Sequence, residues 1–209
     1  MIKNSISQYV TNGAIFKTKK KYRENSWGPF LLSVLTGVVP GVVLKSFWIY
    51  LSISLILIGS LCVALIYIIS AKECTLKKNL TMDSIIYSAW VCNISILEFM
   101  VFTIWKGLDF RFLLIYIPVI IIPVIAGVNV HKKLESANYE HKKNVSSNIR
   151  TTGFLSGILG MNLAAIFRDV DQSTAAIVIL ICFTILNGFM SLGLLSFQKL
   201  YYLNKYDCS

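Results

Sequence analysis

The sequence predicts an all-α membrane protein, a bundle of six transmembrane helices joined by short loops. Two observations lead to this fold class. Hydrophobic residues make up 56% of the 209-residue chain and the mean hydropathy is +0.67, well above the values of soluble domains of this size. The apolar residues also gather in six runs that are long enough, or nearly long enough, to cross a bilayer. Heavy use of Lys, Asn and Ile indicates a bacterial protein, and we expect it to be a multi-pass protein of the cell membrane.

The N-terminal segment, residues 1–26, is predicted to be cytoplasmic, basic and amphipathic. An apolar stripe at helical spacing, which includes Ile6 and Val10, predicts a short helix at the membrane interface. A polybasic cluster then lies directly before the first apolar run: Lys17, Lys19, Lys20, Lys21 and Arg23. Because each such charge near an anionic surface contributes about 1 kcal/mol to binding, we expect this cluster to contact anionic lipid headgroups on the cytoplasmic face.

The first two spans, 27–44 and 46–70, are predicted to form an antiparallel hairpin. Only Lys45 separates them, so the chain must reverse tightly at this point. The first span is short, and Pro40 interrupts its outer half. A re-entrant first segment, with five crossings in total, is therefore an alternative.

The third span, 84–105, carries the only carboxylate predicted to lie within the membrane, that of Glu98. Its 22 residues would extend roughly 33 Å as an α-helix, which matches the hydrocarbon thickness of a bilayer. Asp83 directly precedes the apolar run, and Asp is a favoured helix N-cap residue. We therefore predict that this helix begins at Ser84, with Asp83 as its cap.

The fourth, fifth and sixth spans are predicted at 112–130, 151–167 and 174–197, followed by a basic cytoplasmic tail, 198–209. Two prolines in the fourth span predict a kink. The fifth span contains small residues at the spacing that allows two helix backbones to approach closely: Gly153, Ser156, Gly157 and Gly160. We expect these four residues to form a helix-packing face.

The distribution of basic residues predicts that both termini are cytoplasmic. In this orientation the inner segments contain 16 of the 20 Lys and Arg residues, and the outer segments contain the other four. Cytoplasmic loops of membrane proteins carry such an excess of basic residues. The net charge of +10 is thereby explained by topology, so we predict no nucleic-acid partner.

Four polar residues are predicted to form a cluster within the membrane: Ser95, Glu98, Asn162 and Asn187. Glu98 and Asn162 both lie roughly 5 Å outward of the middle of their spans, and Asn187 lies near the midplane. An ionisable residue at this depth is costly unless it faces the bundle interior and finds partners there. One interpretation is structural, with a protonated Glu98 held by hydrogen bonds. The others are a functional proton or ion site, and a Glu98 that faces lipid or reaches toward the headgroups.

The sequence shows no constellation that indicates catalysis. Its only histidines, His131 and His141, lie in the predicted cytoplasmic connector between the fourth and fifth spans. The sequence has no phosphate-binding glycine-rich loop and no cluster of carboxylates for a metal. We therefore predict no cofactor and no metal, and we do not expect an enzyme.

These observations favour a protein that acts through contacts with another membrane component, as an accessory, immunity or regulatory subunit. The predicted loops are short, so a soluble active site has little room. The partner would be another membrane protein or a second copy of the chain. The alternative is an ion- or proton-coupled permease or channel subunit that uses Glu98, and a remote third is an intramembrane enzyme.

Overall fold

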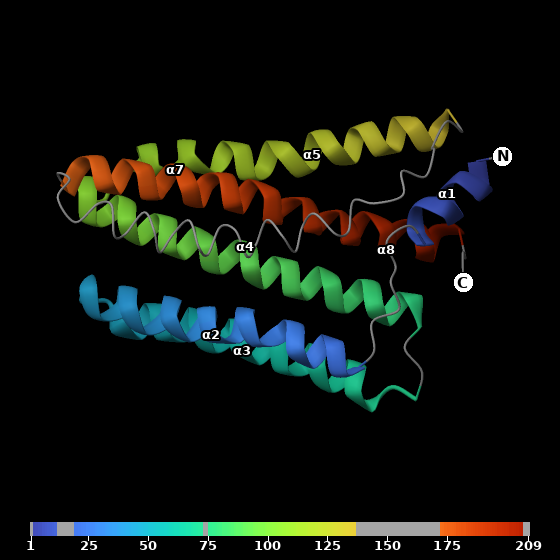
Figure 1. Ribbon diagram of the computed structural model, residues 1–209, viewed down its shortest axis with the longest axis horizontal. Helices are drawn as coiled ribbons and strands as arrows, with labels where there is room; N and C mark the ends of the chain where they lie inside the picture. The colour runs from blue at the N-terminus through green and yellow to red at the C-terminus, as the bar shows by residue number, and fades with distance from the viewer. Residues whose placement is uncertain (1, 12–18, 73–74, 137–171, 207–209) are drawn as a thin grey trace.

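The protein is an elongated bundle of α-helices, described here from a computed structural model (Figure 1). The structure describes residues 2–11, 19–72, 75–136 and 172–206, and this part of the chain contains no β-strand. Its elements are, in chain order, α1 (Ile2–Thr11), α2 (Lys19–Val43), α3 (Phe47–Ser70), α4 (Leu76–Lys106), the 3₁₀ turn η1 (Phe110–Phe112), α5 (Leu113–Glu135), α7 (Gln172–Ser191), the 3₁₀ turn η3 (Leu192–Leu194) and α8 (Leu195–Tyr206).

Five segments of the described chain are long and apolar enough to cross a membrane. They are Tyr22–Val43, Phe47–Ser70, Leu76–Lys106, Phe110–Glu135 and Ser173–Tyr206. The all-helical class is therefore confirmed for the described residues, with five candidate membrane-spanning helices. The fifth predicted span, 151–167, lies outside the described residues.

Helix α4 lies at the centre of the bundle. It packs against α2 and α3 on one side and against α7 and α8 on the other, and Figure 1 shows the α2–α3 pair and the α5–α7 pair on opposite sides of it. An apolar cluster that includes Leu61, Ile68 and Met82 fills the α3–α4 contact. The polar residues of α4 must therefore be considered on both of its sides.

Helices α2 and α3 form the expected hairpin, but α2 is longer than predicted. It begins at Lys19 instead of residue 27 and continues through its two prolines to Val43, so its 25 residues extend about 37 Å. Lys45 makes the reversal with φ of 54°. Gly37 lies against Ser54 of α3 so closely that a Cβ atom would overlap with it. A helix of this length is sufficient for a full crossing, which disfavours the re-entrant alternative.

The predicted start of the third span is wrong. Helix α4 begins at Leu76, two turns before Ser84, and its N-cap is Thr75, whose Oγ1 accepts a hydrogen bond from the Lys78 backbone amide at 3.4 Å. Asp83 consequently lies inside the helix and does not cap it. The prediction followed hydropathy, whereas the helix continues because Leu80 and Met82 are both buried, on opposite sides of α4: Leu80 packs against α1, α5 and α8, and Met82 packs against α2 and α3.

The fourth and sixth spans also extend beyond their predicted ends. Helix α5 continues to Glu135, so His131 lies on a helix and not in a connector. Helix α8 continues α7 through η3 to Tyr206, so most of the predicted tail is helical. The reason is a buried cluster at this end of the bundle, where α1, α4, α5 and α8 meet: Ile6, Tyr9, Val10, Leu80, Leu134, Tyr202 and Leu203.

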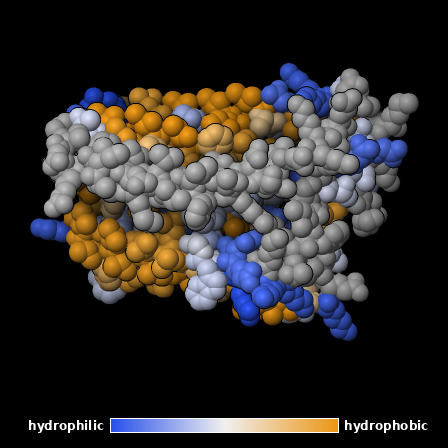
Figure 2. All heavy atoms as spheres, viewed as in Figure 1, coloured by the Kyte–Doolittle hydropathy of each residue, from blue (hydrophilic) through white to orange (hydrophobic). Residues whose placement is uncertain are grey.

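The flanks of the bundle are apolar and its ends are polar. Among the coloured atoms of Figure 2, hydrophobic ones make up most of the two long flanks, and most hydrophilic ones lie in the right-hand half, with a few at the left end. Helix α5 is an example: Ile120, Val124 and Ile125 are all more than half exposed. Such a surface fits contact with lipid acyl chains rather than with water.

Candidate intramembrane polar site

Helices α4 and α7 bring three of the four predicted cluster residues into direct contact. The Asn187 side-chain amide donates one hydrogen bond to Ser95 Oγ at 2.9 Å and another to Glu98 Oε2 at 3.0 Å. Ser95 and Glu98 are three residues apart on α4, so both project toward α7. The fourth residue, Asn162, lies outside the described residues.

The site is closed to its surroundings by close packing of α4, α5 and α7. Glu98 and Asn187 are both completely buried. From α5, the Tyr116 hydroxyl donates to the Ser95 backbone carbonyl at 2.6 Å. Gly188, next to Asn187, lies so near α5 that an added Cβ atom would be 2.9 Å from Ile122 Cδ1. The absence of a side chain at this glycine lets α5 cover the site.

Two oxygens of the site have no hydrogen-bond partner among the described residues. They are Glu98 Oε1 and Asn187 Oδ1, and both are buried. An amide oxygen and an ionised carboxylate oxygen can only accept hydrogen bonds, so neither can satisfy the other. A buried acceptor without a partner costs about 1–3 kcal/mol, and an unpaired buried charge costs more. The Thr184 hydroxyl of α7 also lies beside the Glu98 carboxyl group, but it donates to the Leu180 carbonyl at 2.8 Å. A proton on Glu98 would add a donor to the site, so the arrangement is suited to holding a proton.

A second buried polar network, between α2, α3 and α4, was missed by the sequence analysis. Thr36 Oγ1 donates to Asn93 Oδ1 at 2.8 Å, and Asn93 Nδ2 donates to Ser33 Oγ at 3.0 Å. The Ser54 hydroxyl of α3 donates to the Ser33 carbonyl. All four side chains are at most 3% exposed. The sequence signal was present, since Asn93 lies in the third span, but on a different face of that helix from Glu98.

A third polar group lies at the end of the bundle where α1 packs. His131 Nδ1 is 2.5 Å from the Tyr202 hydroxyl, and His131 Nε2 is 3.1 Å from Glu135 Oε1. Gln198 joins α8 to two other helices, because it accepts from the Tyr9 hydroxyl at 3.1 Å and donates to the Gly127 carbonyl at 3.0 Å. Within the described residues, no three His, Cys, Asp or Glu side chains gather as a metal site would require. These side-chain hydrogen bonds link α1, α5 and α8.

The residues predicted to contact lipid headgroups lie in part on the first turn of α2. Lys19 Nζ donates to the Ile69 carbonyl at 3.0 Å, and exposed Lys20 lies 4.0 Å from Glu24. Arg23 is exposed, and Lys21 belongs to the same turn. Lys17 and the predicted helix-packing residues, Gly153, Ser156, Gly157 and Gly160, lie outside the described residues.

No protein-family model matches this chain, and no curated protein or solved structure matches it either. Only the residues of the chain itself therefore indicate its function. Among them, the site at Ser95, Glu98 and Asn187 has the most distinctive chemistry, because it places an ionisable group and an unsatisfied amide oxygen side by side in an apolar interior.

Proposed function

We propose that the chain crosses the membrane six times. The start of α5 packs against the start of α7, where Phe112 and Leu180 share one buried cluster. The end of α5 packs against α8, where Leu134 and Leu203 share another. Helices α5 and α7 are thus parallel, so the chain between Glu135 and Gln172 has to return across the bilayer. The apolar run 151–167 is the segment suited to that crossing.

We further propose that both termini face the cytoplasm of a bacterial cell. Basic residues gather at the end of the bundle where α2 and α4 begin and α3, α5 and α8 end: Lys19, Lys20, Arg23, Lys72, Lys77, Lys78, Lys132, Lys133, Lys199 and Lys205. At the other end the described residues contribute Lys45, Lys106 and Arg111. The excess supports placing the first end inside. Accessibility of single introduced cysteines to an impermeant reagent in intact cells tests this orientation.

The function that the geometry supports best is that of an ion- or proton-coupled permease or channel subunit with its coupling group at Glu98. The observation that carries this proposal is the pair of unpartnered buried oxygens, Glu98 Oε1 and Asn187 Oδ1. Proton-coupled membrane proteins require a buried carboxyl group that can bind and release a proton, with polar neighbours that stabilise it. Ser95 and Asn187 would position the carboxyl group through their hydrogen bonds.

Proton flux in reconstituted vesicles tests this function. The wild-type chain should dissipate an imposed pH gradient faster than empty vesicles do, and Glu98→Gln should abolish the difference. The Gln side chain retains the shape and hydrogen-bonding capacity of a protonated Glu, so the bundle should fold. Ser88→Ala is the matched control, because Ser88 is on α4 but hydrogen-bonds only to the Ser84 carbonyl of its own helix. An inactive wild-type chain, or an active Glu98→Gln variant, would contradict the proposal.

A second candidate is an accessory, immunity or regulatory subunit that binds another membrane protein or a second copy of the chain. The observation that favours it is the shortness of the connections, since α2 and α3 are joined by three residues, and α4 and η1 by three. Binding surface is then available mainly on the helix flanks, within the membrane. In this role the Glu98 network would only stabilise the bundle, and no catalytic step is needed. Crosslinking in native membranes followed by purification should recover a second membrane protein or a dimer, and recovery of the monomer alone would count against this candidate.

A further inference from the structure

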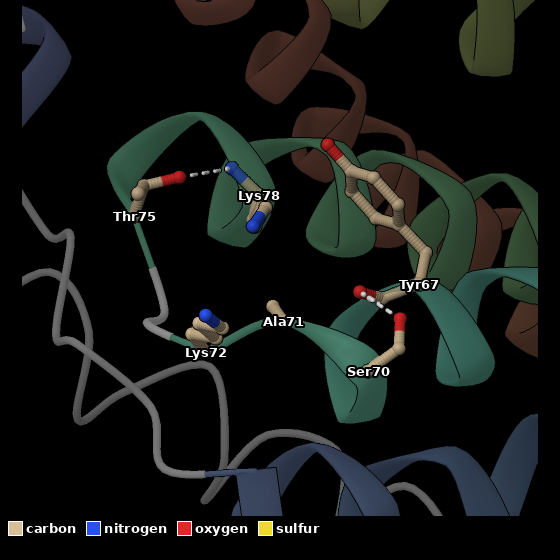
Figure 3. A pocket seen from close by; sticks show the side chains of 6 residues that line it. All are labelled: Tyr67, Ser70, Ala71, Lys72, Thr75 and Lys78. Carbon is tan, nitrogen blue, oxygen red and sulfur yellow. Dashed lines mark hydrogen bonds between the residues drawn. The ribbon is translucent and has the colours of Figure 1, made fainter.

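A pocket of about 530 Å³ lies at the basic end of the bundle, where α3 ends and α4 begins (Figure 3). Its walls come from the last turn of α3, the short connection and the first turn of α4: Tyr67, Ser70, Ala71, Lys72, Thr75 and Lys78. In Figure 3 the side chains of Lys72 and Lys78 both extend into the space between the two helix ends. The pocket is separate from the intramembrane site described above.

The lining chemistry suits an anion. Two lysine side chains line the pocket, and the described residues that line it include no carboxylate, while Glu73 of the same connection lies outside the described residues. Lys78 is half-buried, and its Nζ lies 5.9 Å from the centre of the Tyr67 ring. The first turn of α4, which follows Thr75, contributes the positive end of a 31-residue helix. Each of these features favours negative charge at the same place.

The negative end of α3 would normally oppose an anion here, but a third lysine offsets it. Lys19 of α2 donates from Nζ to the Ile69 carbonyl at 3.0 Å, in the last turn of α3. A cation at the C-terminal end of a helix stabilises its carbonyl dipoles. Lys19 in this position offsets part of the negative end of α3 beside the pocket.

The surroundings of the pocket indicate where the anion comes from. The last turns of α3, which contribute Tyr67 and Ser70 to the pocket, also have an exposed apolar flank, where Val63, Ile66 and Ile69 are each at least half exposed. A free anion would make no favourable contact with this apolar flank, whereas the acyl chains of a lipid would cover the flank and bury its side chains. The pocket therefore combines an anion site at headgroup depth with an apolar surface at acyl-chain depth.

We propose that this pocket binds the headgroup phosphate of an anionic membrane phospholipid, with Lys72 and Lys78 as the phosphate-binding groups. The lipid's acyl chains would lie along the exposed flank of α3. This assignment is independent of the function proposed for Glu98. The proposed site is more specific than a general attraction to anionic lipid, because Lys72 and Lys78 would bind the phosphate and the other lysines at this end of the bundle would not.

Counting bound lipids tests the proposal directly. The full chain in detergent would be titrated with phosphatidylglycerol, and bound lipid counted by native mass spectrometry. At about 1 kcal/mol for each basic residue near an anionic headgroup, removing two of them should weaken binding about 30-fold in the Lys72→Gln/Lys78→Gln variant. The single Lys72→Gln variant should weaken it about fivefold. Lys132→Gln/Lys133→Gln is the matched control, because it removes two exposed charges from the same end of the bundle, outside the pocket, and it should retain wild-type binding.

Three results would overturn the proposal. Equal weakening in the two double variants would show diffuse attraction instead of a pocket. Displacement of the lipid by inorganic phosphate at matched concentration would show a site for a free anion. Unchanged binding in the single Lys72→Gln variant, whose exposed side chain is not needed for folding, would remove Lys72 from the site even if the double variant does not fold.

Discussion

A double-mutant cycle on Glu98 and Asn187 would measure the state of the buried carboxyl group. The variants are Glu98→Leu, Asn187→Leu and the double variant, which replace polar groups with apolar ones of similar size. The wild-type pair is joined by one hydrogen bond of 3.0 Å in a completely buried site. If Glu98 is protonated, this is a neutral hydrogen bond, which within membranes is worth about 0.6 kcal/mol on average and at most about 1.7. If Glu98 is ionised, removal of Asn187 strands a buried charge at about 3–5 kcal/mol.

The two ranges do not overlap, so the measured coupling energy between Glu98 and Asn187 decides between them. The assay is reversible unfolding in mixed micelles with increasing fractions of a denaturing detergent, repeated at acidic and at alkaline pH. We expect a coupling energy of about 0.6–1.7 kcal/mol at acidic pH, where Glu98 is protonated, and a larger one at alkaline pH once the proton is released. A coupling above about 3 kcal/mol at acidic pH would refute a protonated Glu98. A coupling of zero would refute the hydrogen bond itself.

The remaining predictions concern how the helices are held together. Gly37→Leu should destabilise the α2–α3 hairpin by about 1–3 kcal/mol, because the new side chain would overlap with α3. Gly59→Leu is the control, because no atom lies close to that glycine. Thermal unfolding in detergent measures the stability of both variants. Thr75→Ala should cost about 1 kcal/mol by removing the side-chain cap of α4, measured in the same way, with faster amide hydrogen exchange confined to the first turn of α4. Tyr9→Phe should weaken the attachment of α1 to α8 by deleting the hydrogen bond to Gln198, so hydrogen exchange in α1 should rise while that in α5 does not change.

The sequence was sufficient to place most of the helices and one face of α4. Long apolar runs have few alternatives to a helix in lipid, because every backbone amide and carbonyl must be satisfied within its own segment. The recurrence of Ser95 and Glu98 at helical spacing then located a polar face, and the structure places Asn187 against that face. The common depth of Glu98 and Asn162 in the membrane stays a prediction from helix rise, because Asn162 lies outside the described residues.

Helix ends and the second polar network were less accessible to sequence reasoning. Hydropathy falls at the first lysine, so the predicted span began at Ser84, although α4 begins at Leu76. The extension is stabilised by tertiary packing of Leu80 against α1, α5 and α8, which a window along one segment does not contain. Asn93 was missed for a related reason, since its partners are two hydroxyl groups on α2, more than fifty residues away in the chain.

The two buried networks together explain why α4 occupies one defined position in the bundle. Apolar helices gain little free energy by packing against each other instead of against lipid, so apolar contacts alone specify neither the depth nor the rotation of a membrane helix. Hydrogen bonds do specify both, because their geometry tolerates only small displacements. Asn93 fixes α4 against α2, and Glu98 fixes it against α7, at a different angle around the helix. A movement of α4 that breaks one network must also strain the other, so a change in protonation at Glu98 would reach the α2–α3 hairpin through this single helix.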